Sequence, residues 1–315
     1  MMELELISYQ DLLSGNSASY QKISTALLHQ GIVGVSDVPE FENITRAYIA
    51  AARKFSALDS SIKQQYAPNR DADETEGYEL GAEWFKDQAG VWQIDDKKAS
   101  YYAFVPEHPK NKWPREVDLQ TPYLALGKLI FQTGKLLLKI IGLDETVGLN
   151  HSGLIGYGRL LHYHKTGMST NANPLWCGAH FDHGVFTGLA PAYYFQDGKE
   201  IDEPEEAGLY IMPSNGDDFK KINARDKSVL LFQVGEFAQL ISNDRVRSTQ
   251  HRVQKAHDGI ERYTFALFYS AEENMVINSS SQLISDARYA DNKLANGSIS
   301  YKQWETASFE RYRAK

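Results

Sequence analysis

The sequence has very little cysteine, with only Cys177 among its 315 residues. One thiol cannot form an internal disulfide framework or a cysteine-rich zinc site. Positive charge is also scarce, because 33 Lys and Arg stand against 41 Asp and Glu, which gives a formal net charge of −8. This acidic balance argues against an electrostatic footprint for nucleic acid. We therefore expect no nucleic-acid partner.

Long apolar runs are missing as well. The most apolar stretch, residues 124–143, contains Lys128, Lys135 and Lys139, whereas a membrane-spanning helix needs about 20 mostly apolar residues. The opening segment, MMELELISYQ, has neither the basic nor the apolar region of an export signal. We therefore expect no membrane partner and a cytoplasmic location, while the oligomeric state stays open.

The N-terminal part of the chain has the apolar spacing of helices. Apolar residues recur at helical intervals in three segments, and Gly31 and Gly142 follow two of them as stop signals. A short β-branched run after Gly31 favours a strand. The expected helices span residues 17–30, 40–58 and 121–142, and the expected strand spans residues 32–35.

From about residue 153 the pattern changes to short β-rich runs. Turn signals such as Asp197-Gly198 and Asp258-Gly259 separate these runs. Several short strands at such spacing predict a sandwich or a barrel, and the tail returns to a polar helical pattern. We therefore expect a mainly β fold with flanking helices. The expected strands span residues 158–163, 187–195, 208–211, 228–233, 238–241 and 263–269.

The segment GAHFDHG, residues 178–184, carries the strongest chemical signal. His180 and Asp182 lie two residues apart, so on a strand they point to the same face. His251, which follows Asp182 by 251 − 182 = 69 residues, is the candidate for a third metal ligand. Two histidines and one carboxylate leave coordination positions open, which is typical of non-haem Fe(II) oxygenases. Zinc accepts the same ligand types, although the helical zinc-peptidase motif H-E-x-x-H is absent.

A second group of residues suggests an anion receptor. Arg262 and Thr264 share one strand face and begin 262 − 251 = 11 residues after His251. A guanidinium fork beside a hydroxyl suits a carboxylate. An anion receptor one strand away from a metal indicates a ligand with an acid at one end and a chelating group at the other, and 2-oxoglutarate has this shape.

These motifs, in this order, resemble the isopenicillin N synthase-like family of Fe(II)- and 2-oxoglutarate-dependent dioxygenases. The family's H-x-D pair falls on His180 and Asp182, and its distal histidine falls on His251. Its R-x-S clamp falls on Arg262 and Thr264, with Thr in place of Ser. Further matches are GEFAQLISNDRVRSTQHRV to the family's G-D-x-L-Q-x-x-S-N-x-x-x-x-S-x-x-H-R-V, and the N-terminal segments HQGIVGVSDV, FSALDSSIKQQY and NKWP.

The resemblance implies a double-stranded β-helix, or jelly-roll barrel. It implies an N-terminal helical and strand region over residues 1–120, a dioxygenase core with its leading helix over residues 121–285, and a helical tail over residues 286–315. It implies that the H-x-D pair and the distal histidine hold Fe(II), and that the arginine clamp binds the far carboxylate of 2-oxoglutarate.

With O2 as the other substrate, the implied reaction oxidises a C–H bond of a small molecule by hydroxylation, desaturation or cyclisation, and it releases succinate and CO2. No catalytic residue beyond the metal ligands is expected. The resemblance does not name the small-molecule substrate.

Two departures from the family pattern bear on the site. The family's N-Y-Y strand falls on residues 162–164, so His164 replaces the second Tyr and becomes a candidate contact of 2-oxoglutarate. The spacing between Asp182 and His251 is long, and the excess falls in the acidic stretch of residues 196–208, where we expect a solvated loop at the barrel mouth.

Three alternative functions stay open. One is an Fe(II) oxidase of the same fold in which Arg262 binds the substrate's own carboxylate. Another is fragmentation of 2-oxoglutarate to ethylene. The third is a non-catalytic barrel that senses a small acid.

Overall fold

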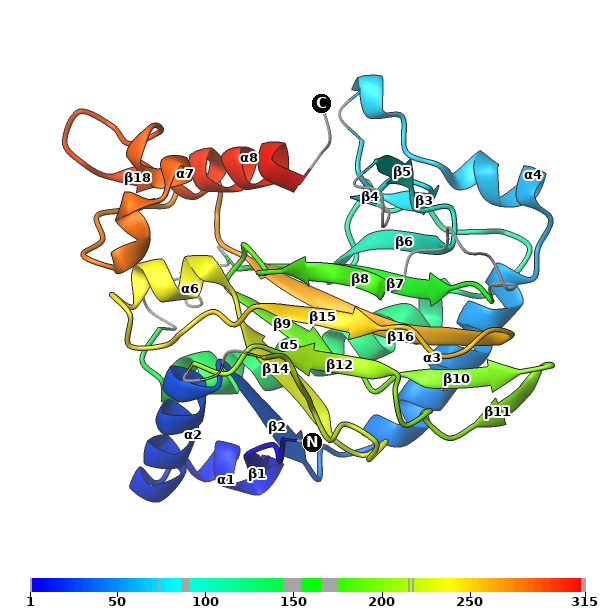
Figure 1. The fold of residues 1–315 in the computed structure, drawn as a ribbon, viewed down its shortest axis with the longest axis horizontal. Helices are drawn as coiled ribbons and strands as arrows, with labels where there is room; N and C mark the ends of the chain where they lie inside the picture. Colours follow the sequence, from blue (N-terminus) through cyan, green and yellow to red (C-terminus); the bar gives the residue numbers. More distant parts are fainter. Residues whose placement is uncertain are drawn as a thin grey trace.

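Two β-sheets face each other across the middle of the molecule, and helices surround them (Figure 1). The computed structural model describes residues 2–72, 74–86, 91–143, 154–165, 175–214, 216 and 218–312. The large sheet has the strand order β1-β2-β14-β9-β16-β7-β6-β3, and a β10–β11 hairpin is attached to β16. The smaller sheet has the order β13-β12-β15-β8. This is the double-stranded β-helix core predicted from the sequence.

The strands of the large sheet are β1 (Leu6–Ser8), β2 (Ile32–Ser36), β3 (Gly77–Leu80), β6 (Lys98–Val105), β7 (Ile155–Tyr163), β9 (Phe186–Leu189), β10 (Tyr193–Gln196), β11 (Lys199–Ile201), β14 (Leu230–Val234) and β16 (Ile260–Ser270). The smaller sheet contains β8 (Leu175–His180), β12 (Gly208–Ile211), β13 (Lys220–Lys221) and β15 (His251–Gln254). Two further pairs are β4 (Trp84–Lys86) with β5 (Trp92–Ile94), and β17 (Val276–Ile277) with β18 (Ile299–Ser300).

The helices are α1 (Tyr9–Ser14), α2 (Ser17–His29), α3 (Phe41–Ser56), α4 (Ser60–Lys63), α5 (Gln120–Ile140), α6 (Glu236–Ile241), α7 (Ala287–Ala290) and α8 (Tyr301–Tyr312). Short 3-10 turns are η1 (Gln64–Tyr66), η2 (Arg70–Ala72) and η4 (Gln282–Ser285).

Helices α3 and α5 pack on the outer face of the large sheet. Leu126, Ile130 and Leu137 of α5 are fully buried at helical spacing, so one stripe of the helix faces the sheet. The close approach depends on Gly134, because a Cβ there would lie 2.1 Å from the Tyr269 hydroxyl oxygen of β16. That hydroxyl donates to the Ile130 carbonyl at 2.6 Å. The large sheet is therefore held from outside by a long, buried helix.

The space between the two sheets is the inside of the barrel. Side chains on β16 alternate, so Tyr263, Phe265 and Leu267 pack in the cluster that contains α3 and α5, while Ala266 joins a cluster that spans both sheets. Members of this inner cluster include Leu161, Tyr163, Trp176, Tyr194, Val253 and Ala266. The alternation decides which functional side chains can reach the interior.

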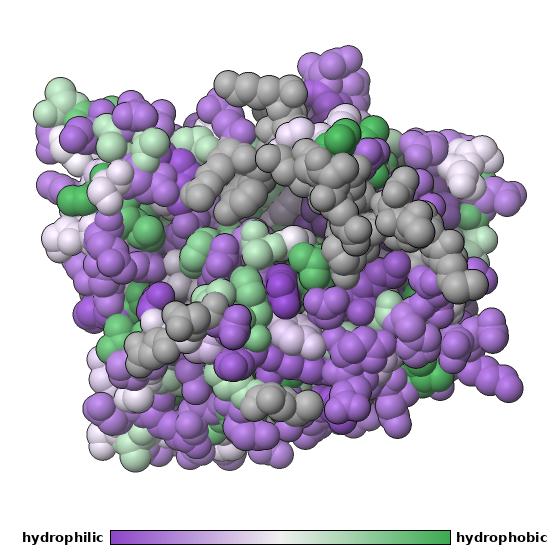
Figure 2. Space-filling view, viewed as in Figure 1, coloured by the Kyte–Doolittle hydropathy of each residue, from purple (hydrophilic) through white to green (hydrophobic). Residues whose placement is uncertain are grey.

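The described part of the face in Figure 2 is mostly hydrophilic, with a hydrophobic patch near the top, where Figure 1 places β4 and β5. Trp84, Trp92 and Ile94 are about half exposed there. Among the described residues, no helix is both long enough and apolar enough to cross a membrane.

The structure confirms the expected helices as α2, α3 and α5, and the expected strand after Gly31 as β2. The expected strand over residues 187–195 is divided into β9 and β10 around Pro191. The expectation of a strand over residues 238–241 was wrong, because these residues lie in helix α6. A short apolar run cannot by itself distinguish a strand from a buried helical turn, and here Gly235 in extended conformation precedes the helix.

Candidate metal centre

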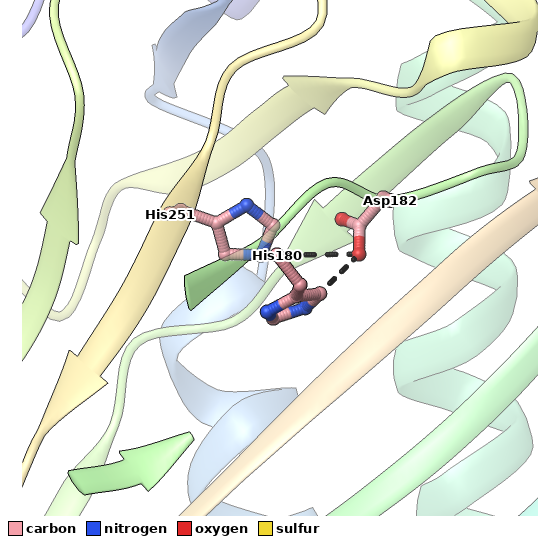
Figure 3. A group of neighbouring side chains, drawn as sticks. All are labelled: His180, Asp182 and His251. Carbon is pink, nitrogen blue, oxygen red and sulfur yellow. Dashed lines mark ion pairs between the residues drawn. The ribbon is translucent and has the colours of Figure 1, made fainter. Parts of the chain in front are cut away.

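His180 and His251 face each other across two neighbouring strands. His180 ends β8, His251 begins β15, and the two residues are directly paired in the antiparallel ladder. Asp182 follows β8 by two residues and turns back toward both rings (Figure 3). One ligand atom from each of the three residues lies within 4.8 Å of the others. The structure thus brings together the three residues singled out as metal ligands from the sequence.

The spacing of the ligand atoms suits one shared ion. Asp182 Oδ1 lies 3.6 Å from His180 Nε2 and 3.8 Å from His251 Nε2. Ligands about 2.1 Å from a common ion lie roughly 3–4 Å apart. Two imidazole nitrogens and one carboxylate oxygen are the donor set of the facial triad for Fe(II). The residues present therefore fit an iron ion.

Backbone contacts fix the orientation of both histidines. His180 Nδ1 lies 2.8 Å from the Gly178 carbonyl oxygen, and His251 Nδ1 lies 3.2 Å from the Thr249 carbonyl oxygen. A carbonyl accepts only from an N–H, so each ring carries a proton on Nδ1, and Nε2 is the nitrogen turned toward Asp182. Ligating histidines are commonly oriented in this way.

The hydroxyl of Thr187 fixes the orientation of the Asp182 carboxylate. Its hydroxyl donates to Asp182 Oδ2 at 2.6 Å, which leaves Oδ1 directed at the two histidines. Burial would raise the pKa of Asp182, yet His251, His180 and the Thr187 hydrogen bond hold that pKa well below its ordinary value. Thr187 was missed in the sequence because it lies outside the metal-ligand motif. Its position on β9, close after the H-x-D pair, is the only sequence signal for it.

The pKa values of the two histidines are shifted in opposite directions. Burial and the neighbouring His180 together lower the pKa of His251 to about 4, against the opposing effect of Asp182, so His251 is neutral near pH 7. Burial also opposes protonation of His180, but Cys177 and Asp182 raise its pKa well above the ordinary value. The raised pKa favours a proton on His180, so a cation that binds at its Nε2 must displace that proton.

Arg262 lies in the barrel interior, as the clamp hypothesis requires. It is paired with Tyr163 on β7 and with Tyr194 on β10, and its guanidinium carbon lies 5.1 Å and 6.0 Å from the centres of those two rings. The side chain is buried, and in the described part of the chain its Nε and Nη1 atoms have no hydrogen-bond partner. Buried donors are normally satisfied. Two unsatisfied guanidinium donors on one side chain indicate an anionic ligand.

Thr264 shares the strand with Arg262 and is also buried. Its hydroxyl donates to the Ala190 carbonyl at 2.8 Å. The structure therefore brings Arg262 and Thr264 to the same inner face of β16. The hydroxyl proton of Thr264 is already used in the hydrogen bond to the Ala190 carbonyl.

The structure does not bring His164 to Arg262. The His164 ring is tilted against the His162 ring with ring centres 4.0 Å apart, and His162 stacks on Tyr263 at 4.1 Å, on the helix-covered face of the sheet. The side chain beside Arg262 is Tyr163. A shift of one residue along a strand moves a side chain to the opposite face, which is why aligning the motif one position further selected the wrong neighbour.

The acidic stretch is not wholly a solvated loop. Residues 199–201 form β11, and the Glu203 carboxylate is buried beside Lys221 at 2.8 Å, with a hydrogen bond from the Tyr194 hydroxyl at 3.0 Å. The expectation of solvent exposure was wrong for Glu203, because Lys221 neutralises it inside the barrel wall. The neighbours Asp202, Glu205 and Glu206 are at least partly exposed, as expected.

The fold is a jelly roll, and it groups two histidines and one carboxylate as a candidate metal site near a buried arginine. Residues 160–271, which contain all of these side chains, match the 2OG-Fe(II) oxygenase superfamily. The match covers 112 of the 315 residues, so similarity to this superfamily is shown for that region of the chain.

Three similar proteins illustrate the relationship. The chain is 28% identical over 191 residues to 1-aminocyclopropane-1-carboxylate oxidase homolog 9 of Arabidopsis thaliana, and the match covers 59% of this chain and about half, 47%, of that relative. A 2OG-Fe(II) oxygenase family protein from Caulobacter crescentus has a TM-score of 0.73 at 20% identity over 98% of both chains. A dioxygenase for auxin oxidation in rice has a TM-score of 0.68 at 16% identity, over 99% of this chain and 97% of that chain.

Proposed function

We propose that this protein is an Fe(II)- and 2-oxoglutarate-dependent oxygenase that oxidises a C–H bond of a small molecule and releases succinate and CO2. The observation that carries the proposal is the combination of one metal-competent triad with one buried arginine that has unsatisfied donors, both inside the same barrel. Hydroxylation, desaturation and cyclisation are all within this chemistry.

The roles of the residues follow from their geometry. His180, Asp182 and His251 would hold the iron, and the Thr187 hydroxyl would keep Asp182 Oδ1 turned toward it by binding Oδ2. Iron in this site supplies the redox chemistry that converts 2-oxoglutarate and O2 to succinate, CO2 and an oxidised product.

Arg262 would bind the far carboxylate of 2-oxoglutarate through Nε and Nη1, the two guanidinium nitrogens that have no hydrogen-bond partner among the described residues. Tyr163 and Tyr194 flank the guanidinium and exclude water from the ion pair. Thr264 contributes through its hydroxyl when that group turns away from Ala190. We assign to Tyr163, in place of His164, the position beside the co-substrate.

An anaerobic titration of the Fe(II)-loaded protein with 2-oxoglutarate tests the proposal. A visible metal-to-ligand charge-transfer band that saturates is the expected result, because it requires the iron and the 2-oxo acid to share one coordination sphere. Arg262→Met should shift the titration to higher 2-oxoglutarate concentration by about tenfold or more, since a buried charge-assisted pair is lost. His164→Gln is the matched control and should titrate like the parent protein.

Iron binding without any such band would contradict the proposal. In that case Arg262 would bind a carboxylate of the substrate itself, and an oxidase that does not use 2-oxoglutarate would take its place. Ethylene in the headspace of an aerobic reaction would instead identify fragmentation of 2-oxoglutarate.

A further inference from the structure

A pair of cationic side chains lies on the inner face of the large sheet, separate from Arg262. Lys98 begins β6 and Arg159 lies in β7, with side chains only 5% and 16% exposed. Both form ion pairs with Glu83, and the Arg159 Nε donates to the Ser100 hydroxyl at 3.0 Å. In the described part of the chain, Glu83 is the one carboxylate that contacts them, so two cations share one anion. The group carries one positive charge in excess.

The register of the sheet places this pair next to the proposed co-substrate site. Lys98 is paired with Tyr163, and Tyr163 is paired with Arg262, so the three form one row across β6, β7 and β16. Neighbouring strands lie about 4.8 Å apart, which puts the backbones of Lys98 and Arg262 about 10 Å from each other. Tyr163 stands between them and also contacts Trp176 of β8, the strand that ends in His180. The pair therefore borders the barrel interior but is offset from the arginine clamp.

Aromatic rings extend from this pair toward the edge of the sheet. Tyr102 and Tyr157 stack with ring centres 5.5 Å apart, and the Arg159 guanidinium lies 5.2 Å from the centre of the Tyr102 ring. Phe104 continues the row at 5.1 Å from Tyr157. These side chains are only partly buried, whereas Leu161 and Tyr163 further along β7 are buried. The inner face of the large sheet thus changes from partly exposed aromatic side chains to fully buried ones, and Lys98 and Arg159 lie where the two parts meet.

Glu83 differs from Lys98 and Arg159 in its position in the fold and in its solvent exposure. Lys98 and Arg159 are fixed on two paired strands, whereas Glu83 precedes β4, outside any strand, and its side chain is 39% exposed. Its carboxylate occupies the point where the two buried cations converge. A carboxylate from another molecule would satisfy the same two cations.

We propose that Lys98 and Arg159 bind the carboxylate of the substrate that is oxidised, that Tyr102 and Tyr157 contact its apolar body, and that Glu83 holds the place of that carboxylate until it is displaced. The substrate class is then a small, partly hydrophobic monocarboxylic acid. This inference rests on the proposed function for the reaction, but its binding test is independent of turnover.

The test compares acids with their uncharged counterparts. Decanoate, 4-phenylbutyrate and cinnamate, each with its methyl ester, are titrated by ligand-observed NMR into the full chain loaded with Zn(II) and 2-oxoglutarate. At least one acid should bind, and it should bind about tenfold or more tightly than its ester, because only the acid makes charge-assisted contacts. Equal binding of acid and ester, or no binding of any acid at millimolar concentration, would overturn the proposal.

Variants separate substrate binding from a merely structural ion cluster. Glu83→Gln should tighten acid binding severalfold, because it removes the competing carboxylate. If the cluster only fastens the chain before β4 to the sheet, Glu83→Gln lowers the melting temperature and leaves acid binding unchanged or weaker, which contradicts the proposal. Arg159→Met should lose the preference for acid over ester. Lys97→Gln, with an exposed lysine next to Lys98 in the chain, is the matched control.

The failure of this inference can be told apart from failure of the proposed function. Formation of the charge-transfer band with Fe(II) and 2-oxoglutarate depends on Arg262 and the triad, and it should persist in Arg159→Met. A normal band without acid binding overturns only the substrate class. Absence of the band in the parent protein overturns the proposed reaction, whatever the acids do. If Arg159→Met fails to fold, the acid and ester comparison on the parent chain still decides.

Discussion

Arg288 and Glu236 form a buried, two-point ion pair although 52 residues separate them in the chain. The guanidinium donates from Nη1 and Nη2 to the two carboxylate oxygens at 2.5 Å and 2.7 Å, and it packs over the Trp304 ring at 4.2 Å. The backbone N–H of Glu236 donates to the Asp182 carbonyl at 2.7 Å. The C-terminal helices are therefore connected to the segment that carries the metal-site carboxylate.

Loss of this ion pair should destabilise the whole protein. Arg288→Met leaves the Glu236 carboxylate buried without its partner, and removal of one member of a buried pair costs about 3–5 kcal/mol. Urea unfolding measures the change. The exposed pair Lys302–Glu273 provides the control, because Lys302→Gln should change the unfolding free energy by less than about 1 kcal/mol. Equal effects of the two variants would show that the buried pair does not hold the C-terminal helices in place.

The hydroxyl of Thr187 should contribute to metal affinity. Thr187→Val keeps the shape of the side chain but removes the hydrogen bond to Asp182 Oδ2, and loss of such an outer contact typically weakens metal binding by about 10–100-fold. Competition with a metal chelator measures the affinity for Mn(II). Thr45→Val is the matched control, because that buried hydroxyl donates only to the Phe41 carbonyl of its own helix. An unchanged affinity in Thr187→Val would mean that Asp182 is oriented by other contacts.

Stability should fall in mild acid because of His164. Burial lowers the pKa of His164 to about 3, with His162, Lys63 and Lys97 acting in the same direction and Glu261 opposing them. The ordinary pKa is 6.5, so the unfolded chain binds the proton first, and the stabilisation that is present above pH 6.5 is lost as the pH falls toward 3. His164→Gln should remove about 3 kcal/mol of this loss between about pH 6.5 and about pH 4.

Urea unfolding of the parent protein and of His164→Gln at several pH values checks this expectation. The variant should show the shallower decline in unfolding free energy as the solution is acidified. Parallel pH profiles would assign the acid sensitivity to other groups. One such group is Glu261, because a hydrogen bond with His162 lowers the pKa of its carboxyl to about 2.

Backbone packing beside the metal site should not tolerate a side chain at position 235. A Cβ on Gly235 would lie 2.1 Å from the Gly184 carbonyl oxygen, so Gly235→Ala must displace the chain that follows Asp182. We expect a loss of about 2–4 kcal/mol in unfolding free energy, together with weaker Mn(II) binding. Gly178→Ala is the control, since nothing lies within 4 Å of its Cβ. Normal metal binding in Gly235→Ala would show that the loop adapts without disturbing Asp182.

The sequence was most informative where chemistry and spacing act together. His180 and Asp182 share a face by simple strand alternation, and the segment around His251 has a dense pattern. The grouping of these three residues was therefore predictable although 69 residues separate Asp182 from His251. Tyr163 shows the limit of this reasoning. The face of a strand residue depends on the register, and one position of misalignment replaced an interior tyrosine with His164 on the opposite face.

Other features depended on tertiary context that no local pattern carries. The sequence pattern does not distinguish Glu203 from the other acidic residues of its stretch. Its contacts with Lys221 and Tyr194 form only in the folded chain. The apolar turn of α6 reads equally well as a strand. Strand β6 was not expected, although Lys98 at its start and the aromatic residues that follow form part of the barrel wall.

The direct pairing of His180 with His251 has a mechanical consequence. Among the described residues, strand β8 is at the edge of the four-stranded sheet and pairs only with β15, through a ladder with irregular register. An ion bound by one histidine from each strand would join β8 to β15 through their side chains, as a cross-link would. Amide hydrogen exchange in β8 should therefore slow when the ion binds, while the interior strands of the large sheet exchange at the same rate with or without it.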